Sequence, residues 1–467
     1  MIKNATLWLL LLLGGALSMP VSAQIFPVDT LVKTGPLNRR INLVFMPDGY
    51  QDSEMPLFIN RVNQTLTSLF GQSPFLEYQP YFNVFAIKVP SAQSGSTHPR
   101  SVTDCGTVPA FTATTYFNST FDFGGIHRLL VPQAAGALGT VLANNFPRYD
   151  QVFVLVNHAE YGGSGGTYAT ASANASATEI MVHEIGHSFA GLSDEYWAGA
   201  QYARETPNMT QTTNPATVRW APWMGGNGIG IYPHTTDPSW KKPHQNCKMQ
   251  ALGQPFCAVC KEAFVERIHT LATPLQSYTP TTLAINSPTQ DLPFALNLLL
   301  PAPNTLRVTW TLNGTVFRRN RATATVPLAQ LPVGTHLVRA VVTDTTALTR
   351  RAAHFVQHSY AVDWTVTRTV TGVSLASATA EYEVETYPNP VGEVLNLAYT
   401  LPRAAPVVLT VIDAAGRTVK TLRYSRQPAG RYQFRLQPQE LGLRGAGTYT
   451  LLLNVDGLLI TRQLVKE

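Results

Sequence analysis

The first half of the chain alternates between strand-like and helix-like patterns of apolar residues. Three short apolar runs have the length of buried strands: residues 41–46 (INLVFM), 82–89 and 152–156 (VFVLV). Apolar residues also recur at helical spacing from Met55 to Phe70, and Ser53 is expected to cap this helix. Helix and strand signals alternate in this way up to about residue 190. The order predicts an α/β domain, which we place at residues 24–272.

The pattern changes after this domain to short alternating strands separated by turn residues. Residues 306–312 alternate between apolar and polar positions and lead into Asn313-Gly314, a strong hairpin-turn signal. Closely spaced strands of this kind predict an immunoglobulin-like β-sandwich at residues 278–368. A stretch rich in Thr, Ser, Ala and Glu at residues 369–385 is interpreted as a linker. Residues 386–467 form a last β-rich unit.

The first residues have the pattern of a secretory signal peptide. Lys3 precedes an apolar run from Leu7 to Leu17, and the small residues Val21-Ser22-Ala23 then provide a cleavage site before Gln24. A membrane anchor is the alternative, but a bilayer span needs roughly 20 apolar residues and this run is shorter. We therefore expect residues 1–23 to be a signal peptide and expect no permanent transmembrane anchor.

Composition and charge narrow the classes of function. Of the 467 residues, 45% are hydrophobic and 13% are charged, which excludes a mainly disordered chain. The net charge is +6, but residues 386–467 hold ten Lys or Arg against five Asp or Glu. Residues 24–385 are consequently neutral. Nucleic-acid binding is not expected, because it requires a concentrated basic face.

The strongest chemical signal is the HExxH sequence His183-Glu184-Ile185-Gly186-His187. Ser176 and Glu179 fit a capping box before it, and Gly191 fits a helix stop after it, so the motif is expected inside a helix. Residues four apart lie on one face of a helix, so both imidazoles can bind one metal ion. Glu184 can then point toward a water bound to that ion. The pattern predicts a zinc site with His183 and His187 as ligands.

A catalytic zinc ion usually has a third protein ligand. Asp194 follows His187 by seven residues, which is about 10.5 Å along a continuous helix and too far to share the ion. The chain must therefore turn back at Gly191. This layout is similar to the metzincin pattern HExxHxxGxxH, with Asp one position after the last His, so we expect a metzincin-like α/β domain. Asp194 is the favoured third ligand and Glu195 is the alternative.

Four cysteines occur in a chain with an export signal, so paired cysteines are favoured over free ones. Cys247 with Cys257 or Cys260 is the expected local disulfide. The alternative is a zinc-ribbon site, which would need Cys105 or a histidine as a further ligand.

Other residues could complete an active site. Met249 could form a methionine turn under the metal ion or belong to the ordinary core. Tyr196 and Tyr232 could donate a hydrogen bond to an oxyanion, although a structural role is favoured for both. Residues 162–166 are interpreted as a mobile glycine-rich loop, before a cleft-edge strand at 169–173 that a peptide substrate could extend.

Several blocks of the sequence resemble the M64 metallopeptidases, known as the IgA peptidase family. The blocks are HEIGHSFAGLSDEYW at 183–197 and those at 41–54, 82–95 and 246–260. The similarity covers about residues 38–270. It implies a zinc-dependent endopeptidase with His183 and His187 as ligands and Glu184 as the general base. Immunoglobulin specificity is a property of particular members and is not implied.

The last unit resembles the type A sorting domain of type IX secretion. The similarity rests on Tyr387-Pro388-Asn389-Pro390, Ile412 to Arg417, Gly447-Thr448-Tyr449 and Lys466. It implies a β-sandwich that the type IX secretion machinery binds, and a secreted or cell-surface protein of a Bacteroidetes-type bacterium. The alternative is a second immunoglobulin-like binding module.

These observations together predict a secreted zinc endopeptidase that acts on protein or peptide substrates. Zinc would lower the pKa of a bound water and polarise the scissile carbonyl, and Glu184 would transfer the proton to the leaving amine. Two alternatives stay open. One is an inert protein- or glycan-binding protein on a peptidase scaffold, and the other is an amidase that acts on cell-wall peptide.

Overall fold

The computed structural model describes residues 24–105, 107–369 and 380–467. The expected signal peptide and residues 370–379 of the expected linker lie outside the described residues. The chain divides into two compact units, Met1–Arg368 and Thr369–Glu467. Within the described residues, we find no helix with the length and apolar character that crossing a membrane requires.

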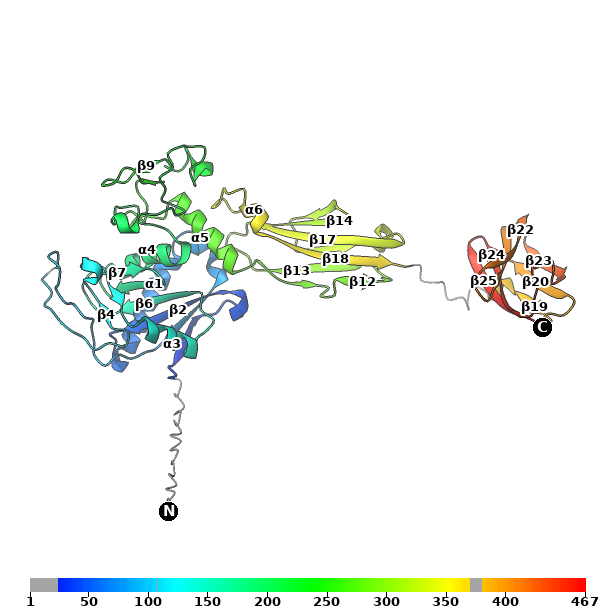
Figure 1. Ribbon diagram of the computed structural model, residues 1–467, viewed down its shortest axis with the longest axis horizontal. Coiled ribbons are helices and arrows are strands. Elements are labelled where there is room, and N and C mark those ends of the chain that lie inside the picture. The colour runs from blue at the N-terminus through cyan, green and yellow to red at the C-terminus, as the bar shows by residue number, and fades with distance from the viewer. Residues whose placement is uncertain (1–23, 106, 370–379) are drawn as a thin grey trace, which may run out of the picture. The chain divides into compact units, whose positions relative to one another are not determined.

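A six-stranded mixed sheet forms the centre of the first unit (Figure 1), with strand order β1-β3-β2-β6-β8-β7. The four inner strands run parallel: β3 (Phe82–Ile87), β2 (Ile41–Asp48), β6 (Gln151–Val156) and β8 (Ala169–Ser172). The two edge strands pair antiparallel: β1 (Val28–Val32) and β7 (Gly163–Gly165). The three apolar runs of the sequence thus form β2, β3 and β6, three of the four parallel strands.

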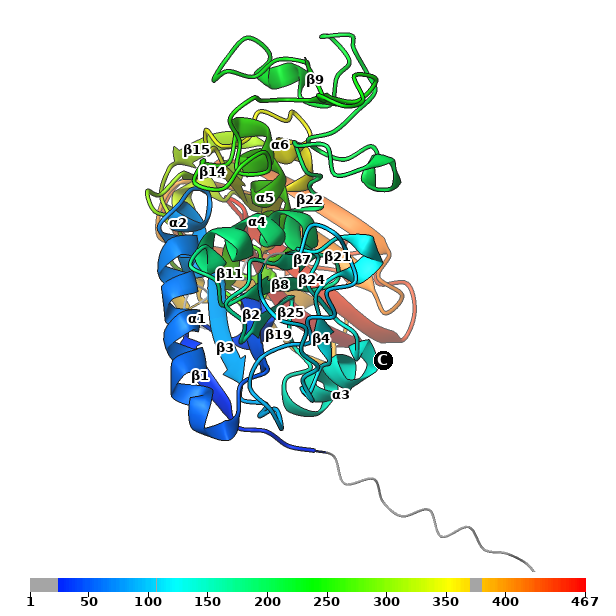
Figure 2. The ribbon, with the colours of Figure 1, turned by 90° about the vertical axis from the view of Figure 1, so that its left-hand side faces the viewer.

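Helices cover both faces of this sheet (Figure 2). One face packs against α1 (Met55–Phe70), α4 (Ala177–Ala190) and α5 (Ala258–Leu271), and the other against α3 (Ala135–Asn145). On β2, Leu43 packs in the cluster on the α1, α4 and α5 face, and its neighbour Val44 packs in the cluster on the α3 face. Both side chains are fully buried. A strand buried on both faces has no polar alternation, which explains the continuous apolar run at 41–46.

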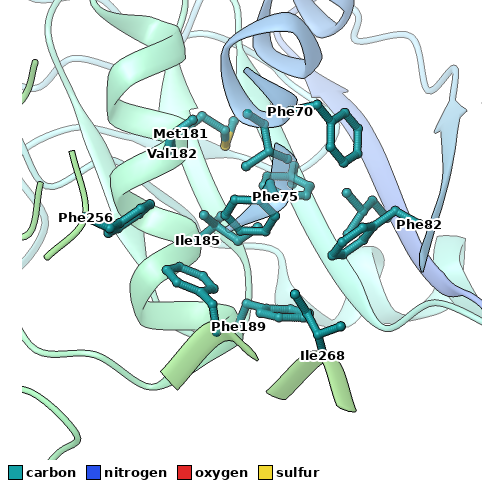
Figure 3. Close-up of a cluster of buried hydrophobic side chains, with 14 of the residues drawn as sticks. Phe70, Phe75, Phe82, Met181, Val182, Ile185, Phe189, Phe256 and Ile268 are labelled. Carbon is teal, nitrogen blue, oxygen red and sulfur yellow. The ribbon is translucent and has the colours of Figure 1, made fainter. Parts of the chain in front are cut away.

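The helix that carries the HExxH motif is held by aromatic packing (Figure 3). Its core-facing residues Met181, Val182, Ile185 and Phe189 lie among Phe75, Phe82 and Phe256. The ring of Phe189 stacks on that of Phe264 from α5, with centroids 6.1 Å apart. The apolar face therefore fixes the rotation of α4, and the side chains of His183, Glu184 and His187 face the cleft instead.

The expected cap of α1 is wrong. A short 3-10 turn, Asp52–Glu54, precedes α1, and Ser53 lies inside it. Gln51 caps this turn instead, because its backbone N–H donates to the Glu54 carboxylate at 2.8 Å and its side chain accepts from the Glu54 backbone. The helix α1 itself begins at Met55, where the apolar spacing starts.

Two β-sheets complete the first unit and enclose a separate core. One sheet contains β11 (Leu275–Thr279), β13 (Leu292–Leu298) and β16 (Thr323–Val326). The other contains β12 (Ala284–Asn286), β18 (Ser359–Arg368), β17 (Gly334–Asp344), β14 (Leu306–Leu312) and β15 (Thr315–Arg319). Trp310 and Trp364 stack in this core, with ring centroids 5.9 Å apart. Asn313 and Gly314 both have positive φ between β14 and β15, so the predicted hairpin turn is confirmed.

Asp344, at the end of β17, connects this β-sandwich to the sheet-and-helix part of the unit. Its fully buried carboxylate accepts hydrogen bonds from Tyr78 Oη at 2.6 Å, His269 Nε2 at 3.0 Å and Thr305 Oγ1 at 2.5 Å. Burial acts to raise the pKa of Asp344, but these hydrogen bonds outweigh it, so the pKa lies below its ordinary value.

The second unit is also made of two packed sheets. One contains β19 (Glu385–Tyr387), β20 (Leu395–Leu401) and β23 (Gly430–Leu436). The other contains β22 (Thr418–Gln427), β21 (Ala405–Asp413), β24 (Gly447–Val455) and β25 (Leu458–Lys466). Fully buried leucines from both sheets, including Leu395, Leu409 and Leu453, form its core.

Short elements complete the fold of the first unit: α2 (Phe75–Tyr78), α6 (His354–Gln357), β4 (Ser119–Thr120), β5 (Val131–Pro132), β9 (Tyr232–Pro233) and β10 (Lys241–Lys242).

Candidate metal centre

The helix α4 ends where the sequence predicts, and the chain then reverses. Gly191 adopts the left-handed conformation, with φ 65° and ψ 28°, and the backbone N–H of Leu192 donates to the carbonyl of Gly186 at 3.0 Å. This conformation costs glycine little, because it has no Cβ. The reversal brings Asp194 back beside the two histidines of the helix.

Three side-chain atoms converge on the solvent side of α4. Asp194 Oδ1 lies 3.0 Å from His183 Nε2 and 3.3 Å from His187 Nε2, and the two Nε2 atoms are 3.3 Å apart. The three residues form one of the clusters whose geometry suits a metal ion. Asp194, the favoured third ligand, is thus brought to the two histidines.

The other ring nitrogens have partners that orient the imidazoles. His183 Nδ1 lies 2.9 Å from the carbonyl oxygen of Lys248, and His187 Nδ1 lies 2.8 Å from that of Leu192. A neutral imidazole that donates from Nδ1 carries its lone pair on Nε2. Two lone pairs and a carboxylate oxygen therefore point at one another, and this donor set fits a divalent metal ion.

The charges of the cluster depend strongly on one another. Burial lowers the pKa of His187, but the hydrogen bond and charge of Asp194 outweigh it and raise this pKa to about 9. Burial raises the pKa of Asp194, but the hydrogen bonds from both histidines outweigh it and hold the pKa well below its ordinary range. Without a metal ion, a proton bound by the histidines thus balances the carboxylate.

Glu184 lies beside the cluster and faces the edge strand β7. Its Oε2 is 3.9 Å from His187 Nε2, its side chain is 12% exposed, and burial raises its pKa. The glycines of β7 leave room for it. A Cβ added at Gly163 would lie 3.3 Å from Glu184 Oε1, and one added at Gly165 would lie 2.8 Å from Glu184 Oε2.

A cleft of about 850 Å³ opens over these residues. Arg128, Tyr161 and Tyr196 line it together with the HExxH residues. The Arg128 guanidinium lies 5.3 Å from the centroid of the Tyr196 ring, and that ring stacks near His183 with centroids 6.3 Å apart. Arg128 lies in a loop without a recognisable motif, so nothing in the sequence marked it as a cleft residue.

The histidine pair and the adjacent glutamate are residues that the family resemblance singled out, and the turned-back carboxylate of Asp194 is the one that the bend at Gly191 predicted. The family model of IgA Peptidase M64 matches residues 30–236. Residues 30–236 are thus similar to the M64 peptidases. The family is one of metallopeptidases, which suggests a metal ion, and it implies a protein substrate.

The second unit matches another family model. Residues 385–467 match the secretion system C-terminal sorting domain. This domain indicates type IX secretion and export, in Bacteroidetes, to the cell surface or the medium.

Solved structures give only weak similarity. Dimeric latent PorU from Porphyromonas gingivalis is 15% identical, with a TM-score of 0.16 over 41% of this chain and 20% of that one. The β-glucuronidase of Parabacteroides merdae is 9% identical, with a TM-score of 0.16 over 49% of this chain and 29% of the enzyme. The chain thus spans less than a third of either protein. No curated protein matches it.

The capping box expected at the start of α4 is wrong. Ser176 precedes α4 but makes no side-chain cap hydrogen bond. Glu179 binds elsewhere, since its carboxylate lies 2.5 Å from Lys248 Nζ and accepts the backbone N–H of Gly253 at 2.7 Å. This ion pair holds the segment whose carbonyl orients His183.

The glycine-rich stretch also differs from the expectation. Residues 163–165 form β7, the edge strand of the sheet, rather than a loop. The strand β8 at 169–172 lies between β6 and β7, so it is not at the edge. Glycine is a poor strand former in general, but here the close approach of α4 requires it.

Met249 and Tyr232 lie in different surroundings. Met249 is fully buried under α4, where a Cβ at Gly186 would come within 2.6 Å of its sulfur. Tyr232 hydrogen-bonds to the carbonyl of Gly228 at 3.3 Å and is not among the residues that line the cleft.

The cysteines do not form the expected disulfide. All four are free thiols in the structure, and Cys105 lies in a different cluster, with His98, Asp122 and His127. Cys247, Cys257 and Cys260 instead surround Glu195. The side chain of Glu195 is thus buried among sulfur atoms, and it is not part of the cluster that His183, His187 and Asp194 form.

Proposed function

We propose that the chain is an exported zinc-dependent endopeptidase in which His183, His187 and Asp194 bind the zinc ion. The observation that carries this proposal is the convergence of two Nε2 atoms and one carboxylate oxygen within 3.3 Å, beside Glu184 and under an open cleft. Two imidazoles and one carboxylate are an ordinary catalytic zinc set, which leaves a position for water. A zinc ion held by these three residues would lower the pKa of a water molecule and polarise the scissile carbonyl.

Glu184 is the general base of the proposed reaction. Burial raises its pKa, which suits a group that must accept a proton and then give it up. Glu184 takes the proton of the attacking water and delivers it to the leaving amine. Tyr196 and Arg128, which line the same cleft, are placed to donate hydrogen bonds to the carbonyl oxygen as it gains charge.

The edge strand β7 is the proposed binding surface for the substrate backbone. The backbone groups of Gly163 bind Arg128 and Leu130 on the side of β7 away from β8, so those of Gly165, two residues further along the strand, face the same way. An extended peptide that paired there would lie next to Glu184 and His187, which both approach Gly165.

We further propose a metzincin-like α/β catalytic domain with Met249 as its methionine turn, at residues 24–272. An immunoglobulin-like domain at 278–368 and a linker at 369–385 would separate it from the sorting domain at 386–467. The sorting domain would direct the chain to the type IX machinery.

The decisive experiment compares cleavage of casein or a fluorogenic peptide by the full chain and by Glu184→Ala. Loss of the general base should lower kcat about 10³-fold, while metal content and Tm stay unchanged. A chelator should abolish wild-type activity and added zinc should restore it. Equal activity of the two proteins would refute the proposal, and cleavage of peptidoglycan alone would favour the amidase.

A further inference from the structure

We propose that Glu195, Cys247, Cys257 and Cys260 bind a second zinc ion, separate from the candidate metal centre. The four possible ligand atoms lie within 4.8 Å of one another. None of the four residues is more than 7% exposed. Because all four ligands come from the protein, the site would be closed to substrate and structural in role.

The distances in the cluster match a tetrahedral zinc site. Cys260 Sγ lies 3.6 Å from the sulfur atoms of both Cys247 and Cys257. Glu195 Oε1 lies 3.3 Å from Cys260 Sγ and 3.9 Å from Cys257 Sγ. Zinc–sulfur and zinc–oxygen bonds of ordinary length put tetrahedral ligands about 3.8 Å (S to S) and about 3.6 Å (S to O) apart. The ligands therefore need little movement to bind the ion.

The local sequence positions these ligands in the way that zinc sites use. Cys257 is the N-cap of α5 and Cys260 lies in its first turn, so the CxxC spacing brings both sulfur atoms to one helix end. The backbone N–H of Cys257 approaches Cys247 Sγ at 3.4 Å. The ammonium group of Lys242 donates to the backbone carbonyl of Glu195 at 2.8 Å and balances part of the negative charge.

The carboxylate of Glu195 provides an independent argument. It is fully buried, and Asn208 donates to its Oε1 at 3.2 Å. Among the described residues, its Oε2 has no hydrogen-bond partner. A buried carboxylate with an unsatisfied oxygen is costly unless it is paired or binds a metal ion.

A disulfide explains the cluster less well. Three cysteines can form one disulfide, which would leave the third thiol buried beside Glu195. Zinc would instead engage all three sulfur atoms and the carboxylate. Soft thiolate ligands in a tetrahedral arrangement select zinc over magnesium or calcium.

The position of this cluster suggests what the ion would do. Glu195 follows Asp194 directly, and its backbone N–H donates to the carbonyl of Met249 at 2.7 Å. Cys247 precedes Lys248, whose carbonyl orients His183. A zinc ion that joins Glu195 to Cys247 would therefore fix two neighbours of the candidate metal centre.

The test measures metal in the full chain and in variants, and it does not depend on peptidase activity. Cys257→Ser and Cys260→Ser should each lose about one zinc per chain. Cys105→Ser is the matched control, because this cysteine lies outside the cluster, so the ion bound by Cys247, Cys257 and Cys260 should stay in place. The comparison is between variants, since the first unit contains other clusters of possible ligands.

Two further measurements use protein that keeps all three cluster cysteines, so they test the proposal even if a Cys257 or Cys260 variant does not fold. Cobalt-loaded wild type and Cys105→Ser should show the same thiolate-to-cobalt charge-transfer band. The three cluster thiols should react with a thiol reagent only after a chelator is added. A disulfide found by mass spectrometry, iron in place of zinc, or reactivity that is independent of the chelator would overturn the proposal.

Discussion

Replacing Gly165 by alanine tests whether β7 and α4 fit together as the proposed active site requires. The added Cβ would lie 2.5 Å from His187 Cβ, 2.6 Å from His187 Cδ2 and 2.8 Å from Glu184 Oε2. Ordinary carbon contacts are about 3.5–4.0 Å, so the histidine must move by about 1 Å. The opposite face of α4 packs against aromatic rings, so the helix has little room to yield.

A displacement of about 1 Å at a catalytic group can cost about 10²-fold in rate. We expect a loss of this order in kcat/KM for a fluorogenic peptide, together with weaker metal binding. Gly166→Ala is the matched control, because a Cβ there meets no atom within 4 Å. A kcat/KM of Gly165→Ala equal to that of Gly166→Ala would show that the geometry of β7 and α4 does not control activity.

Three further substitutions probe other parts of the first unit. Asp194→Asn should lose about one metal ion per chain, because a neutral amide is a poor zinc ligand, and elemental analysis measures this loss. Arg128→Ala should lower kcat by about 10²-fold if the guanidinium stabilises the developing charge, as steady-state kinetics would show. Asp344→Asn should lower the free energy of unfolding by about 3 kcal/mol, measured by urea denaturation at neutral pH. The pKa of Asp344 is lowered in the folded chain, so its stabilising effect is complete above the unfolded carboxyl pKa of about 3.9. The difference between the two proteins should therefore shrink as the pH falls below about 4 and through the folded pKa.

Each of these predictions has a result that would contradict it. A full metal content in Asp194→Asn would remove this residue from the ligand set. If kcat is unchanged in Arg128→Ala, the guanidinium does not stabilise the developing charge and only packs against the Tyr196 ring. A difference that grows in acid would mean that Asp344 is protonated in the folded chain.

The sequence predicted the parts of the fold that local patterns determine. The strand at 41–46, the helix ending at Gly191 and the turn at Asn313-Gly314 each depend on a few adjacent residues. Caps were less predictable, because each depends on which nearby side chain binds the groups at the start of a helix. Gln51 caps the 3-10 turn before α1, and Lys248 binds the carboxylate of Glu179, which was expected to complete the capping box of α4.

Residues brought together from distant segments could not be predicted in the same way. Arg128 and Gly165 reach the cleft because β7 lies beside both α4 and the loop at 128–130, a contact that no spacing in the sequence encodes. The fourth member of the cysteine cluster was missed for the same reason. A disulfide was expected, and the alternative zinc-ribbon site called for Cys105 or a histidine, whereas Glu195 lies beside the three cysteines.

The sequence left open whether Asp194 or Glu195 joins the two histidines. Adjacent residues in a turned, non-helical segment direct their side chains apart, so both carboxylates cannot serve one ion. Asp194 points to the histidines and Glu195 to the sulfur atoms of the cysteine cluster. If each carboxylate binds its own ion, Asp194→Asn and Glu195→Gln should each lose a different metal ion. Only Asp194→Asn should then keep the thiolate-to-cobalt band, and loss of the same ion from both variants would show that the two clusters are one site.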